Sequence, residues 1–216
     1  MKKILLLFYC IIGNILLLAQ APKKPNIITF IVDDMGWTDA FNPNYYTPNM
    51  AKLAKQGVKF NQAYATPVCT PTRTSFISGM NAAHHGVTNW TSPVKDKNSD
   101  ADDQQFSPSP WKINGLSPNE YTSYPQLLKQ AGYFTIHVGK AHWGAAGTPQ
   151  ANPYNVGFQV NISGHAAGHP QSYYGKDNYG NLPGKVSLQA VPDLEEYHGS
   201  SVFLTEALTL EALKSL

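Results

Sequence analysis

The segment CTPTR at residues 69–73 is the part of this chain best suited to chemistry, because it sets a cysteine four residues before an arginine. Once an apolar amino-terminal run containing Cys10 is set aside, Cys69 is the single cysteine left and cannot form an internal disulfide. Such a cysteine is either a spare thiol or a reactive group. Pro71 fixes the backbone just after it, and Arg73 adds a permanent charge with a planar set of donors. An inert buried cysteine and an ordinary surface arginine are the alternatives.

The pair Asp33–Asp34 ends another apolar run. Adjacent carboxylates repel each other unless a cation lies between them, and their hard oxygens favour calcium or magnesium over zinc. Ligand sites of open α/β sheets gather where strands end. Aspartates at such a point also form turns or caps. The pair by itself favours a cap, and it favours a metal site only together with the other segments.

Lys140 and His142 lie in the segment GKAHWG at 139–144, directly after an expected strand. Lysine can oppose negative charge that develops on a reacting group, and histidine can act as a general base near its own pKa. Residues two apart on an extended backbone point to the same side. The two side chains could therefore act on one substrate, although either alone would more often be structural or solvated.

Three segments, KPNIITFIVDDMGW at 24–37, CTPTR followed by Ser78–Gly79, and GKAHWG at 139–144, follow one another in the order and at the separations found in type I sulfatases. From Lys24 to its end the chain resembles these formylglycine-dependent sulfatases of the alkaline phosphatase superfamily. The resemblance implies a sulfatase. An amino terminus with the form of a secretory signal makes it a secreted or periplasmic enzyme, and export together with a tyrosine-lined loop favours a sulfated carbohydrate as the substrate. The resemblance also implies an α/β fold, with a central, mostly parallel sheet flanked by helices.

By this resemblance, a formylglycine-generating or sulfatase-maturing enzyme oxidises Cys69 to formylglycine. One hydroxyl of the aldehyde hydrate attacks sulfur, and the other loses a proton and expels sulfate. The resemblance also implies that calcium, in preference to magnesium, is bound by Asp33, Asp34 and the modified residue 69.

The resemblance gives Arg73 the task of holding the hydrate, Lys140 that of contacting a sulfate oxygen, and His142 that of accepting the proton. Two positions depart from the family pattern. Thr72 stands where serine is frequent, which puts recognition by the maturing enzyme in doubt. Ala141–Trp143 replaces the frequent Trp-His-Leu, which affects only the packing around Lys140 and His142.

Other residues allow weaker predictions. His165 and His169 lie in a glycine-rich loop ahead of Tyr173–Tyr174, a composition that suits sugar binding but equally suits a loop without a role. His84–His85 follows the cysteine helix, and we expect it to be structural.

Alternating apolar runs and capped helical patterns predict an α/β domain. Expected strands are continuous apolar runs, and expected helices are bounded by Thr-Pro, serine or glycine. The strands are expected at 26–32, 58–63 and 133–138; the helices at 48–56, 74–79 and 122–130 and from Ser200 or Ser201 onward; and polar or loop segments at 88–119 and 145–192.

Residues 1–21 have the form of a secretory signal peptide, with Lys2 and Lys3, an apolar run and small residues at its end. An uncleaved anchor is the alternative, and no later stretch is apolar enough to span a membrane. Without these residues, 14 basic side chains balance 14 acidic ones. This balance argues against nucleic-acid binding, which requires a clustered basic surface.

Residues 22–216 are expected to form the amino-terminal part of a sulfatase catalytic domain, because no second acidic metal pair follows His142 at the family's position. We therefore expect the 216-residue product to be incomplete and weakly active or inactive. A phosphonate or phosphate ester hydrolase of the same superfamily and a non-catalytic remnant that binds sulfated glycans are the alternative interpretations.

Overall fold

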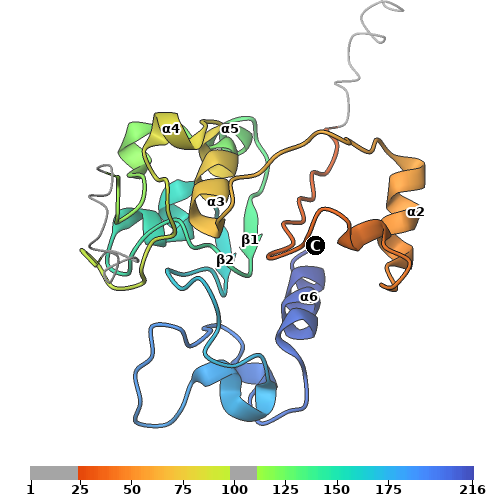
Figure 1. The fold of residues 1–216 in the computed structure, drawn as a ribbon. Helices are drawn as coiled ribbons and strands as arrows, with labels where there is room; N and C mark the ends of the chain where they lie inside the picture. The colour runs from red at the N-terminus through yellow and green to blue at the C-terminus, as the bar shows by residue number, and fades with distance from the viewer. Residues whose placement is uncertain (1–23, 98–110) are drawn as a thin grey trace, which may run out of the picture. The chain divides into compact units, whose positions relative to one another are not determined.

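A computed structural model describes residues 24–97 and 111–216 (Figure 1). The chain forms two compact units, Met1–Lys59 and Phe60–Leu216. The predicted signal peptide and part of the polar segment expected at 88–119 lie outside the described residues.

In the first unit, the strand expected at 26–32 is not formed. Its apolar side chains are exposed, as at Phe30, which is 83% accessible. A strand requires hydrogen bonds to a neighbouring strand, and the described residues of this unit supply none. The strand expected at 58–63, a segment that spans the boundary between the two units, is absent as well, and Phe60 is exposed.

The helix of the first unit forms where its sequence predicts it. Helix α2 (Pro48–Gln56) begins with proline in its first turn and ends at Gly57. Thr47 occupies the N-cap position, but its hydroxyl donates to the carbonyl of Ala40 at 2.6 Å instead of capping the helix. A short 3-10 helix, η1 (Asp39–Phe41), precedes it.

In the second unit, strands β1 (Ile136–Val138) and β2 (Val160–Ile162) pair in parallel, with Ile136 opposite Val160. Strand β1 forms the last three residues of the strand expected at 133–138. Strand β2 was not predicted, because it is a three-residue piece within a segment dominated by glycine, proline and asparagine. The parallel pair with its flanking helices confirms the α/β fold class.

Three helices lie together near this pair (Figure 1): α3 (Cys69–Ser78), α4 (Ala82–His85) and α5 (Tyr124–Gln130). Ser123 caps α5 by accepting from the backbone N–H of Gln126. A buried apolar cluster is formed by Ile77, Ala141, Trp143, Val156 and Phe158, and Tyr124 of α5 packs against it. The cluster joins α3 to the segment that follows β1.

The remaining connections are turns and loops that contain short 3-10 helices: η2 (Pro118–Glu120), η3 (Pro149–Ala151), η4 (Pro153–Val156), η5 (Gly175–Gly180) and η6 (Glu195–Tyr197). The last helix, α6 (Leu204–Lys214), packs on a second cluster formed by Tyr179, Val191, Leu194, Tyr197, Leu204 and Ala207. It begins later than predicted, because the Ser200 hydroxyl bonds to the Tyr197 carbonyl in the preceding turn.

Candidate active site

Cys69 is the first residue of α3, which therefore begins five residues earlier than the sequence predicted. The helix predicted at 74–79 began after Pro71 and so left this proline outside. The first turn of a helix tolerates proline, because the N–H that proline lacks would have no partner within the helix there. The start of the helix at Cys69 directs its positive dipole end toward the cysteine.

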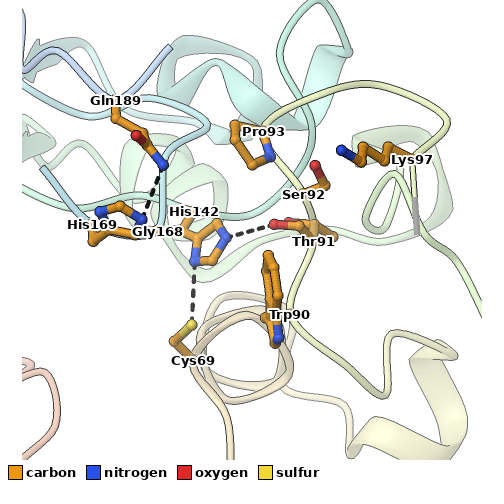
Figure 2. Close-up of a pocket in the computed structure, with 10 residues that line it drawn as sticks. All are labelled: Cys69, Trp90, Thr91, Ser92, Pro93, Lys97, His142, Gly168, His169 and Gln189. Atoms are coloured by element: carbon orange, nitrogen blue, oxygen red, sulfur yellow. Dashed lines mark hydrogen bonds between the residues drawn. The ribbon is translucent and has the colours of Figure 1, made fainter. Parts of the chain in front are cut away.

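His142 lies just beyond β1, where it meets Cys69. The distance from Cys69 Sγ to His142 Nδ1 is 3.3 Å (Figure 2). His142 is 1% exposed, and its Nε2 lies 2.9 Å from the backbone carbonyl oxygen of Thr91. One ring nitrogen thus faces the cysteine and the other faces a fixed acceptor.

The backbone at His142 has a left-handed φ of 53°, an uncommon conformation for a residue other than glycine. The extended geometry expected for the segment from Lys140 to His142 therefore does not hold. The His142 N–H donates to the carbonyl of His165 at 3.0 Å, which helps to fix this conformation.

Gly168 packs directly against the His142 ring. A Cβ atom placed at Gly168 would lie 2.5 Å from Cε1 of that ring and 2.9 Å from Nδ1. Only a residue without a side chain permits this approach, so the ring is confined on that side as well.

Arg73 lies one turn after Cys69 on α3 and is 5% exposed. Its Nη1 donates to the backbone carbonyl of Lys140 at 2.7 Å. Lys140 itself is half-buried, two residues beyond the end of β1. The structure therefore brings three of the predicted residues, Cys69, Arg73 and His142, into one connected group, with Lys140 bound to it through its backbone.

His137, on β1, is a further titratable group near Arg73. Burial among the rings of Trp143 and Phe158 lowers the pKa of His137 to about 4, and the Arg73 charge acts in the same direction. Its Nε2 lies 3.0 Å from the Gly139 carbonyl. His137 is therefore neutral at physiological pH.

A pocket of about 460 Å³ opens beside Cys69 and His142 (Figure 2). Among the described residues, ten line it, and none of them is acidic: Cys69, Trp90, Thr91, Ser92, Pro93, Lys97, His142, Gly168, His169 and Gln189.

Sequence reasoning considered His169 either as a sugar-binding residue or as a loop residue without a role, and it missed the pocket residues Trp90, Lys97 and Gln189. The Nε2 atoms of His169 and Gln189 are 3.0 Å apart. The tryptophan and the lysine stand in the polar segment after α4, where nothing in their spacing distinguishes them. His165 does not line the pocket, and burial lowers the pKa of its ring.

Asp33 and Asp34 belong to the first unit, where they form an exposed turn and Asp34 has a φ of 53°. They were expected at the end of a buried strand, and the segment before them is not a strand. The oxygens of these two carboxylates suit a hard cation such as calcium. Residues 24–97 and 111–216 nevertheless contain no group of three or more His, Cys, Asp or Glu side chains able to hold a metal ion.

The chain is similar to known proteins over most of its length. The family model described as Sulfatase matches residues 25–213. N-acetylgalactosamine-6-sulfatase of Mus musculus is 36% identical over 147 residues, which cover 66% of this chain and 26% of that protein. A sulfatase of Formosa agariphila is 36% identical over 183 residues, which cover 76% of this chain and 32% of that protein. The chain thus matches only about a quarter to a third of these relatives' length.

Among solved structures, Ps i-CgsB matches with a TM-score of 0.62 and 28% identity over 89% of this chain and 41% of that one. Its complex with k-i-k-neocarrahexaose matches with a TM-score of 0.51 and 24% identity over 78% of this chain and 35% of that one, a likeness of fold alone. Within the described residues, no helix has the length and apolar character needed to cross a membrane.

Proposed function

The chain belongs to the sulfatase family, and from this premise we propose that its site serves the hydrolysis of a sulfuric ester of a carbohydrate. The observation that carries the proposal is the contact between Cys69 Sγ and His142 Nδ1 at 3.3 Å, which joins a nucleophile position to a base. Arg73, buried on the same helix as Cys69, adds a permanent positive charge and bonds to the carbonyl of Lys140, two residues before His142.

We propose that Cys69 acts as formylglycine, made by a formylglycine-generating or sulfatase-maturing enzyme. The Sγ atom then stands in for an oxygen of the aldehyde hydrate, which supplies the nucleophilic hydroxyl. The position fits this group in two ways. It lies at the amino end of α3, where backbone N–H groups and the helix dipole favour negative oxygen, and it borders a pocket that a substrate could enter.

The chain's own side chains have separate tasks in this proposal. His142 Nδ1 takes a proton from the oxygen at position 69, as a general base within hydrogen-bonding reach. Lys140 opposes charge on a sulfate oxygen. Arg73 is held by its bond to the Lys140 carbonyl, and its task is to hold the hydrate at position 69.

Asp33 and Asp34 are proposed as ligands of calcium in preference to magnesium. The support is the oxygen chemistry of the two carboxylates and the family to which the chain belongs. No step of the reaction is assigned to the ion.

A sulfated glycan is the proposed substrate, and the composition of the pocket supports it. Trp90 offers an aromatic face for a sugar ring, and the pair of His169 and Gln189 offers hydrogen-bonding groups for hydroxyls. Lys97, together with the absence of acidic side chains among the described residues that line the pocket, suits an anionic ligand. N-acetylgalactosamine-6-sulfatase, a relative, carries a sulfated sugar in its name. We further propose that the protein acts outside the cytoplasm, in the periplasm or as a secreted enzyme.

Mass spectrometry of the peptide containing Cys69, from protein isolated from its native producer, tests the proposal. We expect the mass of the aldehyde or its hydrate in place of the thiol. Because we expect the 216-residue chain to be weakly active or inactive, a sulfated oligosaccharide is compared with its phosphate and phosphonate analogues by relative rate, and any measurable release of sulfate should be the fastest of these reactions. Cys69→Ala should abolish this release. A fully unmodified thiol would contradict the proposal, and a preference for the phosphate or phosphonate analogue would favour the related hydrolases.

A further inference from the structure

Thr70, a buried residue next to Cys69, has no assigned role in the proposed reaction. It is fully buried, and its Oγ1 accepts a hydrogen bond from the backbone N–H of Thr91 at 3.0 Å. The Thr91 peptide is therefore tied to the first turn of α3 by a side chain that immediately follows the cysteine.

The same Thr91 residue faces the far side of the His142 ring. The Thr91 carbonyl can only accept, so the 2.9 Å contact requires His142 Nε2 to carry the hydrogen. In a neutral imidazole the other nitrogen, Nδ1, then has the free lone pair. This is the nitrogen that lies 3.3 Å from Cys69 Sγ.

These contacts form a closed ring of interactions. Thr70, the covalent neighbour of Cys69, bonds to Thr91; Thr91 contacts His142; and His142 contacts Cys69. The hydroxyl of Thr70 lies 3.4 Å from Nδ1 and 3.3 Å from Nε2 of the ring. Near-equal distances to both nitrogens show that the hydroxyl does not select one of them directly. Its influence on the tautomer passes through the Thr91 peptide.

We infer that Thr70 is a positioning residue which, by holding the Thr91 carbonyl against Nε2, keeps His142 in the Nε2–H tautomer with its basic nitrogen toward residue 69. The inference rests on the proposed function for its catalytic meaning. The tautomer itself can be measured without any activity.

The chain offers a matched control one turn along the same helix. Thr74 is 1% exposed, and its Oγ1 has no hydrogen-bond partner among the described residues. Thr70→Val and Thr74→Val therefore make the same nearly isosteric change at similar burial in one helix. They differ in whether the deleted hydroxyl accepts a bond.

The test is nitrogen-15 NMR of the His142 ring in the purified 216-residue protein with unmodified Cys69, at a pH well above the ordinary histidine pKa of about 6.5. His142→Gln identifies the signals by their loss. We expect a single Nε2–H tautomer in the wild-type protein, in Thr70→Ser and in Thr74→Val. In Thr70→Val we expect mixed tautomers or exchange-broadened signals.

An Nδ1–H ring or a doubly protonated ring in the wild-type protein would overturn the inference, even if Thr70→Val failed to fold. An unchanged Nε2–H tautomer in a folded Thr70→Val would also overturn it. Failure of the proposed function would appear separately, as an unmodified Cys69 in protein from the native producer, and would leave this measurement intact.

Discussion

Arg73 donates from Nη1 to the backbone carbonyl of Lys140 at 2.7 Å, and this bond ties α3 to the segment after β1. Arg73 is the only arginine in a sequence whose other 15 basic residues are lysines. A guanidinium can donate several hydrogen bonds in one plane, whereas an ammonium is a strongly hydrated point charge. The planar guanidinium therefore explains why an arginine, and not a lysine, occupies this buried position.

Replacing Arg73 by lysine should destabilise the protein although the charge is kept. The shorter donor group would leave the Lys140 carbonyl without its charged partner and would bury a more strongly hydrated cation. Because hydrogen bonds to charged groups contribute about 1.5–3 kcal/mol, we expect a loss of this size in the free energy of unfolding, measured by urea titration. Lys129→Arg, at an exposed position in α5, is the control and should change little. Equal stability of Arg73→Lys and wild type would contradict this role.

The pKa of His137, lowered to about 4, predicts a specific pH dependence of stability. Between about pH 6.5 and 4 the unfolded chain binds a proton at this residue that the folded protein does not bind. The contribution of His137 to the free energy of unfolding is therefore fully present above pH 6.5. It falls as the pH drops toward 4 and stays constant below pH 4. The expected change is on the order of 3 kcal/mol.

This change is measured by comparing urea unfolding of wild type and His137→Gln across that range. His85 and His165, whose pKa values burial also lowers, are present in both proteins, so their effects cancel in the difference. The gap between the two stability curves should narrow, or reverse in favour of the variant, as the pH falls. A gap that does not depend on pH would show that His137 titrates normally.

The elements that the sequence predicted well are those whose signals are local. Helix α2 has its limits in the residues at its two ends, Pro48 and Gly57, and it forms between them. The strand expected at 26–32 depends instead on partners elsewhere in a sheet, and its apolar composition could not supply them. Strand β2 was not predicted because it is defined by its pairing with β1 and has almost no sequence pattern of its own.

The candidate site shows the same division. The spacing of Cys69, Arg73 and His142 singled out the groups that could react, and the structure brings them together, although their catalytic roles stay predictions. The contacts of Thr91 with this group come from its backbone N–H and carbonyl, which every residue except proline has. The identity of the Thr91 side chain could not reveal these contacts. They become visible only in the structure, where the backbone passes the His142 ring.

Gly168 is expected to resist substitution because of its contact with the His142 ring. In Gly168→Ala the new methyl group would lie 2.5 Å from Cε1, and the ring is already held from the Cys69 and Thr91 sides. Overpacking of this kind costs about 1–3 kcal/mol. Urea unfolding should show this loss, and the NMR signals of the His142 ring should shift.

Gly57→Ala is the control for this substitution, because the nearest atom to its new methyl group is a backbone oxygen 3.4 Å away. It should unfold within about 1 kcal/mol of the wild type. Similar behaviour of the two variants would mean that Gly168 does not confine the ring.

Trp90 is expected to contribute to glycan binding through its exposed indole face. The side chain lines the pocket beside Cys69 and is 37% exposed, so its removal should leave the fold largely intact. An aromatic contact of this kind contributes on the order of 1 kcal/mol, which corresponds to roughly a fivefold change in Kd. Calorimetric titration of a sulfated oligosaccharide into Trp90→Ala should show this weakening.

Phe134→Ala is the control for this substitution. It removes a more exposed aromatic ring, 66% accessible and outside the pocket lining, and should bind the oligosaccharide as the wild type does. Equal weakening in both variants, or none in Trp90→Ala, would exclude the indole as the platform for the sugar.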